Sequence, residues 1–445
     1  MAKKTVQYIC QSCGSAHPKW AGRCEVCGEW NSLTENVVAV TGRMTKAKTQ
    51  VLKPQKLIDV KPLAQKNRLI TGIDDVDVVL GGGIIPGSIN LITGEPGIGK
   101  STLIMQIANN ISKDKSVLYV SGEESADQIR MRAQRLDAES RTIDIVTSTS
   151  TDDVAATVSS GQYELVIVDS IQTMATDLIA SSPGSVSQIT NSTQLLITAA
   201  KESKTALLVV GHVTKQGNIA GPKLLEHLVD VVLNLEGDRY GGFKVLRSIK
   251  NRYGSTNEAG IFEMKNNGLI PINNPSAALL AERQISDGSV VLATMEGSRP
   301  LLVEVQALVN PTAFGYPKRT ASGIDLNRLN LLIAMLSRRT KLKLDDKDVY
   351  VNVVGGLKIQ EPAADLAVCM AIASAAKGMS LKKDAVVFGE VGLSGEVRHV
   401  GQVEKRLAEA KKMGFNSAIG PKSKSKSKSL NTVSNVREAL NSFLG

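Results

Sequence analysis

Four cysteines near the start of the chain have the spacing of a metal site. Cys10 and Cys13 form one C-x-x-C pair, and Cys24 and Cys27 form a second. Each pair brings two thiolates onto a tight turn, and four thiolates complete the tetrahedral shell that Zn²⁺ prefers. Because this shell leaves no open position, we predict a structural zinc whose binding supplies most of the folding free energy of the module.

The remaining cysteine and the two tryptophans have different expected roles. In a reducing compartment the four clustered cysteines are better explained by metal than by disulfides. Cys369 lies in the apolar run LAVCMAIASAA and is expected to be a core residue. Trp20 and Trp30 flank the second cysteine pair and are available for stacking. The zinc module can therefore contact either DNA or a partner protein.

A glycine-rich segment matches the phosphate-binding pattern G-x-x-x-x-G-K-[ST]. It follows the strand-like run SINLIT and opens the helical run TLIMQIANNI, which is the context that such a loop requires. Backbone N–H groups of the loop and the helix N-terminus bind phosphate oxygens. Lys100 is expected to reach the β- and γ-phosphates of ATP, and Ser101 to ligate Mg²⁺. The predicted loop residues are Gly94, Glu95, Pro96, Gly97, Ile98, Gly99, Lys100, Ser101 and Thr102.

Carboxylates follow two other strand-like runs. Asp169 ends the apolar run LVIVD; alone it is an ordinary strand-end residue, but beside a phosphate loop it is the predicted Walker-B acid on the magnesium side. Glu123 ends the run SVLYVSGEES and is the predicted group that activates the attacking water. Glu124 is the alternative, because one of two adjacent carboxylates must point elsewhere.

Three further polar residues lie at strand ends. His212 follows ALLVVG, where it can sense the γ-phosphate or be merely structural. Lys250 and Arg252 occupy alternate positions in KNRYG, so their side chains share one side of the strand end. They are either an exposed strand tip or arginine-finger-type contacts to the nucleotide of a neighbouring subunit.

Several folded units are expected in a chain of 445 residues. We predict a four-cysteine zinc finger at 1–34, a basic linker at 35–66, an ATPase domain at 67–270 and an α+β domain at 271–445. In the ATPase domain, buried β-branched runs alternate with helical stretches, which is typical of a parallel α/β sheet.

The formal net charge of +10 is concentrated in particular segments. Between positions 41 and 67 there are seven basic residues and one acidic residue. This excess of positive charge is equally compatible with contact to a phosphate backbone and with a solvated linker. The tract KSKSKSKS is expected to be a solvated loop. No apolar run is long enough to span a membrane and the first residues lack a signal-peptide pattern, so we expect a cytoplasmic protein without a membrane partner.

Taken together, these motifs resemble the bacterial RadA (Sms) family of DNA-repair proteins. The resemblance covers the four-cysteine module, the loop GEPGIGKST, the strand LVIVDS, the motif KNRYG (commonly KNRFG) and the C-terminal region. It implies a RecA-like ATPase core and a homo-hexameric ring whose ATP hydrolysis is stimulated by DNA. It also implies branch migration on single-stranded DNA and branched recombination intermediates, with the RecA recombinase as functional partner. Lys100 would be the essential loop lysine, and Lys250 and Arg252 part of a motif tied to function on DNA.

The C-terminal region is similar to the proteolytic domain of Lon, with one important departure. Lon-type peptidases use a Ser-Lys dyad with the serine in a P-S-A-G context, whereas this chain has Ala363 between Pro362 and Ala364. Glu404 best matches the place of the lysine, and Lys405 is adjacent. Without a hydroxyl no acyl-enzyme can form, so the domain is expected to be a ring scaffold and DNA-contacting surface.

The sequence thus favours an ATP-driven motor of recombinational DNA repair. The polar segments after Asp169 and after His212 are candidates for contact with the DNA strand. A RecA-fold signalling ATPase, whose turnover ignores DNA, is the first alternative. A Lon-type protease is the second, and Ala363 argues against it.

Overall fold

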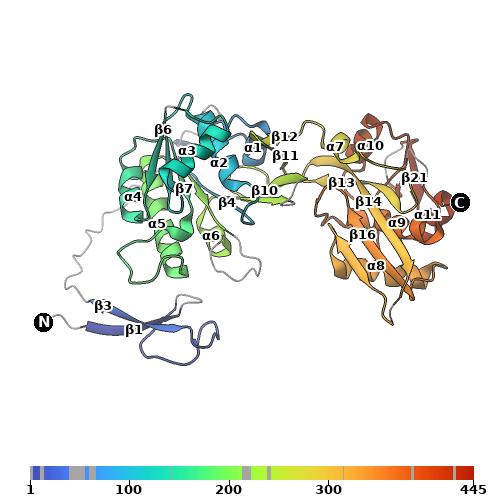
Figure 1. Ribbon diagram of the computed structural model, residues 1–445, viewed down its shortest axis with the longest axis horizontal. Helices are drawn as coiled ribbons and strands as arrows, with labels where there is room; N and C mark the ends of the chain where they lie inside the picture. The colour runs from blue at the N-terminus through green and yellow to red at the C-terminus, as the bar shows by residue number, and fades with distance from the viewer. Residues whose placement is uncertain are drawn as a thin grey trace. The chain divides into compact units, whose positions relative to one another are not determined.

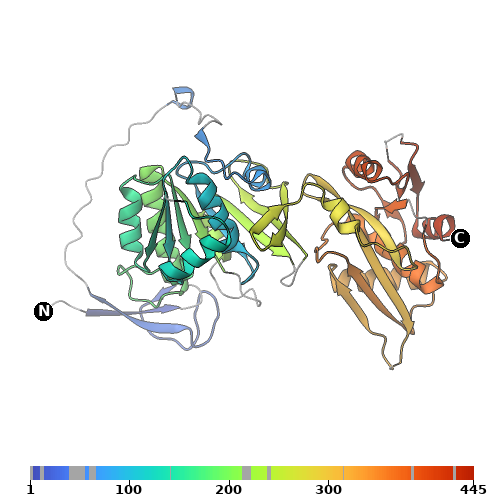
Figure 2. The same cartoon turned by 45° about the horizontal axis from the view of Figure 1, so that its top comes forward.

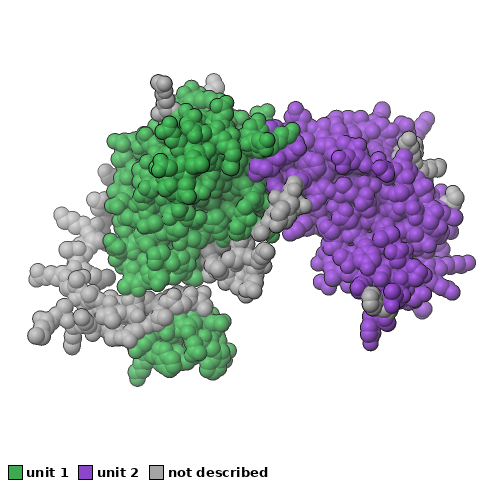
Figure 3. Space-filling model, viewed as in Figure 1, with its two compact units in different colours: residues 1–236, 246–256, 265–269 green, residues 237–245, 257–264, 270–445 purple. Residues whose placement is uncertain are grey.

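The computed structural model describes residues 4–10, 15–39, 56–59, 67–140, 142–212, 222–237, 242–313, 315–381, 385–423 and 427–444. The chain forms two compact units, coloured separately in Figure 3. Unit 1 comprises residues 1–236, 246–256 and 265–269, and unit 2 comprises residues 237–245, 257–264 and 270–445. Cys13, most of the basic segment 41–67, the segment 213–221 and the middle of the KSKSKSKS tract lie outside the described residues.

The cysteine-bearing module is a small antiparallel sheet. Its strands are β1 (Lys4–Cys10), β2 (Ala16–His17) and β3 (Leu33–Ala39), in the order β2-β1-β3. The only apolar cluster among its described residues gathers Cys10, Cys24 and Leu33, with Tyr8 and Ala21 beside them. A core of this size cannot offset the conformational entropy of folding, so the module needs a further source of stability.

The ATPase region is built on a nine-stranded sheet in the order β12-β11-β10-β9-β4-β8-β7-β5-β6. The six strands from β9 to β6 are parallel. Four of them, β4, β5, β7 and β8, are buried along their whole length, as their apolar sequences predict. The strands are β4 (Ile89–Gly94), β5 (Val117–Ser121), β6 (Ile143–Thr147), β7 (Leu165–Asp169), β8 (Ala206–Val210), β9 (Val231–Gly237), β10 (Phe243–Asn251), β11 (Ala259–Lys265) and β12 (Gly268–Pro271).

Helices cover both faces of this sheet (Figures 1 and 2). Apolar residues of α4, α5 and α6 pack with those of the central strands in one cluster. Ser125 caps α3 with a capping box, and the Ser150 and Ser185 side chains cap α4 and α5, so each helix begins where a hydroxyl accepts a backbone N–H. The helices are α1 (Asp74–Leu80), α2 (Lys100–Ile111), α3 (Ala126–Arg135), α4 (Thr151–Ser159), α5 (Val186–Ser203) and α6 (Pro222–Leu228), with 3₁₀ turns at Leu57–Asp59 and Ile171–Thr173.

Unit 2 is a mixed seven-stranded sheet in the order β15-β16-β14-β13-β17-β20-β21. Residues of α8, α9 and α11 pack in one apolar cluster, and residues of α10 pack in a second. The strands are β13 (Ser289–Glu296), β14 (Arg299–Pro311), β15 (Arg319–Ser322), β16 (Lys347–Val353), β17 (Ala385–Val387), β20 (Ser417–Pro421) and β21 (Leu430–Val433), beside the small pair β18 (Glu390–Val391) and β19 (Val397–Arg398). The helices are α7 (Pro275–Leu280), α8 (Leu326–Arg339), α9 (Asp365–Lys377), α10 (Val403–Lys412) and α11 (Val436–Phe443), with a 3₁₀ turn at Pro362–Ala364.

The predicted fold class is confirmed: the chain contains a parallel α/β core, a cysteine-bearing module and a C-terminal α+β region. Cys369 is fully buried in α9, as its apolar run predicts. Among the described residues, no helix combines the length and apolarity that crossing a membrane requires.

Candidate nucleotide-binding site

The loop between β4 and α2 has the backbone of a phosphate cradle. Gly94 has φ +150°, and a Cβ there would lie 2.4 Å from the carbonyl oxygen of Leu235, so only glycine fits. Gly97 also has positive φ, and no atom lies within 4 Å of the position that its Cβ would take. The turn ends at Gly99, with φ +113°, immediately before α2 begins at Lys100. The loop therefore presents its backbone to an open space at the N-terminus of a helix, as phosphate binding requires.

Lys100 is buried beneath this loop and crosses it. Its Nζ donates hydrogen bonds to the carbonyl oxygens of Gly94 at 2.9 Å and Glu95 at 3.1 Å. Burial lowers the pKa of Lys100, while the nearby charges of Asp169 and Glu123 oppose that shift. Ser101 and Thr102, in the first turn of α2, are half-buried. A buried ammonium facing two carboxylates fits a triphosphate carrying Mg²⁺.

Asp169 ends β7 at the carboxyl edge of the sheet, and its carboxylate is held by a phenol. The Tyr119 hydroxyl, from the neighbouring strand β5, donates to Asp169 Oδ2 at 2.7 Å. Both side chains are buried. Burial raises the pKa of Tyr119 well above its usual range, and the charge of Asp169 raises it further, so the phenol keeps its proton and remains a donor.

The two adjacent glutamates after β5 have separate partners. Glu123 Oε1 accepts a hydrogen bond from Ser170 Oγ, on the residue that follows Asp169. Glu124 instead forms an ion pair with Arg132 of α3. The structure thus brings Glu123 towards Asp169 and engages Glu124 with a helix.

His212, at the end of β8, joins this group. Its Nε2 lies 3.4 Å from Glu123 Oε1, so the two form an ion pair whenever the imidazole is protonated. Its backbone carbonyl accepts a hydrogen bond from Gln172 Nε2 at 3.4 Å. Lys100, Asp169, Glu123 and His212 therefore come from four different strand ends and meet at one edge, where parallel α/β sheets bind their ligands.

Lys250 and Arg252 lie at the other edge of the same sheet. Arg252 Nη1 is 3.1 Å from Asp230 Oδ1, and Asp230 Oδ2 accepts a hydrogen bond from the backbone N–H of Ile89, the first residue of β4. The phosphate loop follows the last residue of β4, so the length of β4 separates the two places. Lys250 Nζ donates to the carbonyl oxygen of Glu226 in α6 at 2.6 Å. The structure therefore does not bring these two cations to the phosphate loop of their own subunit.

The rest of the KNRYG motif packs against the end of α1. The Asn251 side-chain amide donates to the carbonyl oxygen of Leu80 at 3.2 Å. A Cβ on Gly254 would lie 3.1 Å from the Cα of Gly81, so the glycine allows two backbones to approach closely. Burial raises the pKa of Tyr253 to about 12, and the neighbouring carboxylate of Asp230 adds to this shift. Part of the motif is therefore structural.

The described cysteines of the N-terminal module form a cluster suited to a metal ion. The sulfurs of Cys10, Cys24 and Cys27 all lie within 4.8 Å of one another, and those of Cys10 and Cys27 are 3.6 Å apart. Thiolates bound to one tetrahedral Zn²⁺, at about 2.3 Å each, would lie roughly 3.8 Å apart, so the cluster fits zinc. A hydrogen bond from Ser15 is the main cause that lowers the pKa of Cys24 to about 5, which favours the thiolate that a metal needs.

The Lon-like region has no nucleophile where the dyad serine would stand. Ala363 is buried in the cluster that includes α10. Glu361, which is partly exposed, instead forms an ion pair with the buried Arg406, whose Nη1 also donates to the carbonyl oxygen of Ala293 at 2.7 Å. Lys405 is exposed and donates to the carbonyl oxygen of Ser298. The place of the dyad is filled by apolar packing and a structural ion pair.

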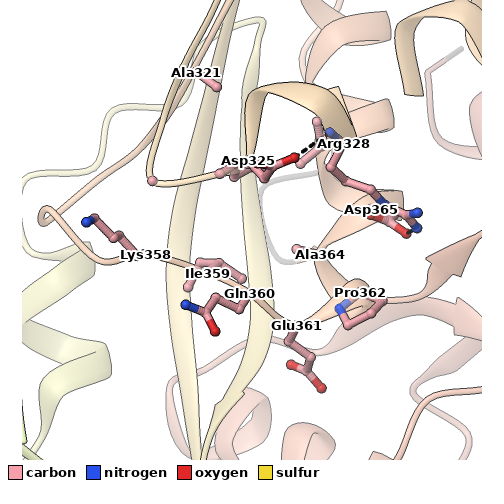
Figure 4. A pocket seen from close by; sticks show the side chains of 13 residues that line it. Ala321, Asp325, Arg328, Lys358, Ile359, Gln360, Glu361, Pro362, Ala364 and Asp365 are labelled. Carbon is pink, nitrogen blue, oxygen red and sulfur yellow. Dashed lines mark hydrogen bonds and ion pairs between the residues drawn. The ribbon is translucent and has the colours of Figure 1, made fainter. Parts of the chain in front are cut away.

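A pocket of about 570 Å³ opens beside Ala363, shown in Figure 4. Its polar lining includes Asp325, Arg328, Lys358, Glu361 and Asp365. Arg328 and Asp365 form a bidentate ion pair in its wall. Among the described residues that line this pocket, none carries a hydroxyl or a thiol, so the lining offers no serine, threonine or cysteine nucleophile.

Sequence reasoning missed the residues that support these groups. Tyr119 stands inside an apolar strand and Ser170 next to a predicted site residue, so only the geometry singles them out. Ser15 and His17 lie beside Cys24, with the Ser15 hydroxyl 3.2 Å from its sulfur and His17 Nε2 3.5 Å from it. A phenol in a buried strand is, from the sequence alone, indistinguishable from a packing residue, so no sequence signal identified Tyr119.

Comparisons with known proteins agree with each part of this architecture. Residues 54–218 match the AAA domain family, residues 8–35 match the rubredoxin metal binding domain, and residues 330–424 match the subunit ChlI of Mg-chelatase family. With a phosphate loop, paired carboxylates and a parallel sheet, the chain is an ATPase-family protein with a RecA-like core, a zinc ribbon and a Lon-like C-terminal region.

The similarity to curated proteins extends over the whole chain. DNA repair protein RadA of Halalkalibacterium halodurans is 45% identical, covering 95% of this chain and 93% of its own length. That of Bacillus subtilis is 44% identical over 100% of both chains, and that of Brucella abortus is 45% identical over 95% and 92%. Among solved structures, a RadB recombinase aligns with 46% of this chain and 100% of its own at 20% identity and a TM-score of 0.38, which is too low to carry an argument. The chain belongs to the RadA family of DNA repair proteins.

Proposed function

We propose that this protein is a DNA-dependent ATPase that drives branch migration of recombination intermediates as a ring-shaped motor. The single observation that carries the proposal is the convergence of Lys100, Asp169 and Glu123 at the carboxyl edge of the sheet. A net charge of +10 suits a polyanionic partner. The relatives named DNA repair proteins support the assignment to repair.

The phosphate side of the site consists of the loop and Lys100. ATP supplies the phosphoanhydride bond when it is bound. The backbone N–H groups from Gly94 to Thr102 would bind its phosphates, and Lys100 would neutralise the charge that develops on the γ-phosphate. Ser101 and Asp169 would hold Mg²⁺.

Glu123 is the group best placed to accept a proton from the attacking water. The hydroxyl of Ser170, the residue that follows Asp169, donates a hydrogen bond to Glu123 Oε1 and so holds Glu123 close to Asp169. His212, whose Nε2 lies 3.4 Å from Glu123 Oε1, would sense the γ-phosphate. Glu124 is a poorer candidate because Arg132 already neutralises it.

Lys250 and Arg252 would act on a neighbouring subunit. The six-residue strand β4 separates them from the phosphate loop of their own chain. At about 3.3 Å per residue, this separation is roughly 20 Å, beyond the reach of either side chain. Their opposite position supports a head-to-tail ring in which each subunit completes the site of the next, and we propose a homo-hexamer.

The proposed substrates are single-stranded DNA and branched recombination intermediates, and the proposed functional partner is the RecA recombinase. The segments following Asp169 and His212 would contact the strand. The zinc ion would have a structural role, and the surface of the zinc module would bind DNA or a partner protein.

ATP hydrolysis measured with and without single-stranded DNA at low salt tests the motor directly. We expect DNA to raise the rate in the wild type, and Lys100→Ala to be inactive in both conditions. Turnover that does not respond to DNA would instead favour a signalling ATPase. Cleavage of casein would favour a protease.

A mixing experiment tests the ring. Arg252→Ala should lose hydrolysis and keep nucleotide binding, and Lys100→Ala should lose hydrolysis as well. In a mixed ring, the Lys100→Ala subunit lends its intact Arg252 to the intact loop of the other variant. Partial recovery of hydrolysis on mixing is therefore expected, and no recovery in demonstrably mixed rings would argue against shared sites.

A further inference from the structure

We propose that Tyr119 is a positioning residue for the magnesium side of the site: its hydroxyl fixes which oxygen of Asp169 faces the metal. This inference rests on the proposed ATPase function and concerns a residue outside the phosphate loop. The observation behind it is the hydrogen bond of 2.7 Å from the phenol to Asp169 Oδ2.

The strand register brings the two side chains together. Tyr119 pairs with Ile167 across β5 and β7, and Asp169 is two residues further along β7. Residues two apart on a strand project from the same face, so the phenol and the carboxylate lie on one side of the sheet. Both side chains are buried here, since Tyr119 is only 1% exposed and Asp169 only 8%.

The hydroxyl is not needed to fill space. A phenylalanine would occupy almost the same volume within this apolar strand, without burying a polar group that needs a partner. The group that does need the hydroxyl is Asp169, which would otherwise be free to rotate about its terminal bond. With Oδ2 held by the phenol, Oδ1 is the oxygen left for a metal ion or its bound water.

Magnesium makes this restraint chemically relevant. It demands a nearly octahedral arrangement of oxygens and tolerates small displacements poorly. A carboxylate held in one orientation meets that demand without losing further rotational freedom on binding. Tyr119 acts through Asp169 and does not itself contact the reacting atoms.

A magnesium titration of basal ATP hydrolysis tests the proposal. Tyr119→Phe should raise the Mg²⁺ concentration for half-maximal hydrolysis by roughly threefold to tenfold, since one hydrogen bond to the carboxylate is lost. Binding of a fluorescent ADP in EDTA should be unchanged, because no metal is involved. Mn²⁺, which accepts more distorted geometries, should reduce the difference between variant and wild type.

Tyr163→Phe is the matched control. Tyr163 also donates to an aspartate, Asp144 Oδ2 at 2.8 Å, but this exposed pair joins the turn before β7 to the start of β6, away from the phosphate loop. The control should keep the wild-type Mg²⁺ dependence.

The outcomes separate this inference from the proposed function. An active Tyr119→Phe protein with wild-type Mg²⁺ dependence would overturn the positioning role and leave the motor untouched. Loss of ADP binding in EDTA would overturn it too, because Tyr119 would then be a packing residue. A wild type whose hydrolysis ignores DNA would contradict the motor and still allow the Mg²⁺ shift to be measured.

Discussion

The nucleotide site in unit 1 and the Ala363 region in unit 2 are two places where a strand end or loop meets the start of a helix, with opposite outcomes. At the first, a buried lysine faces two carboxylates across an open glycine loop. At the second, the corresponding catalytic position holds a methyl group packed into the core. Each region keeps the backbone fold that supports a catalytic site in its class of enzyme. The difference in chemistry therefore comes from the side chains that occupy the catalytic positions.

The treatment of buried charge differs between the two regions. Lys100 hydrogen-bonds to two carbonyl oxygens, which a phosphate can replace. Arg406 is bound by Glu361, by two carbonyl oxygens and by the ring of Phe388, with the guanidinium 5.7 Å from the ring centroid. A cation so fully engaged stabilises structure and is not available to a ligand.

The largest effect is expected at the nucleotide site. Lys100→Ala should reduce ATP turnover by roughly a hundredfold to a thousandfold, because a charge aimed at the developing anion is lost. Steady-state phosphate release measures it. Lys113→Ala, at an exposed position just beyond the end of the same helix, is the control and should retain turnover. Near-normal activity of Lys100→Ala would mean that the loop is not the catalytic site.

In unit 2 the largest expected effect is on stability. Arg406→Met should destabilise the region by about 2–4 kcal/mol, because Glu361 is left without its partner in a mostly buried place. Arg398→Met breaks an exposed, solvent-screened pair with Glu396 and should leave the stability of the region nearly unchanged. Hydrogen exchange in peptides of α9 and α10 compares the two variants. Equal protection in both would contradict the structural role of Arg406.

Restoring the missing hydroxyl should not restore a protease. In Ala363→Ser the new hydroxyl is buried, and Lys405 is exposed and bonded elsewhere. We expect no cleavage of casein and a loss of about 1–2 kcal/mol of stability from burying the hydroxyl. Measurable peptide hydrolysis, abolished by a serine-directed inhibitor, would show that the dyad is latent rather than lost.

The smallest effect concerns the structural part of KNRYG. Asn251→Ala removes the hydrogen bond to the end of α1 and should cost about 1 kcal/mol locally. Hydrogen exchange of the α1 peptides should show it, with Asn191→Ala on the surface of α5 as a control. A large loss of turnover with α1 unaffected would instead give Asn251 a direct role at the subunit boundary.

Much of this architecture follows from local sequence. The apolar runs that become β4, β5, β7 and β8 are buried on both faces, so their composition alone identifies them. The phosphate loop can be predicted from the sequence because the positive φ angles at Gly94 and Gly99 require glycine at these positions. The cysteines are readable because two C-x-x-C pairs at this separation are typical of a zinc site.

What could not be predicted depends on contacts between distant parts of the chain. The choice between Glu123 and Glu124 depends on Ser170 and Arg132, which a single strand pattern does not reveal. Arg252 lies at the edge of the sheet opposite the phosphate loop because it pairs with Asp230, 22 residues earlier in the chain. Tyr119 was hidden because a buried phenol in a strand is indistinguishable from packing until its partner is known.

Displacement of a labelled strand from a three-stranded branched DNA tests the central claim most directly. We predict displacement by the wild type with ATP, and none with a non-hydrolysable analogue or with Lys100→Ala. Protein that hydrolyses ATP but leaves the branch point where it was, with its zinc retained and at low salt, would contradict the proposed motor function.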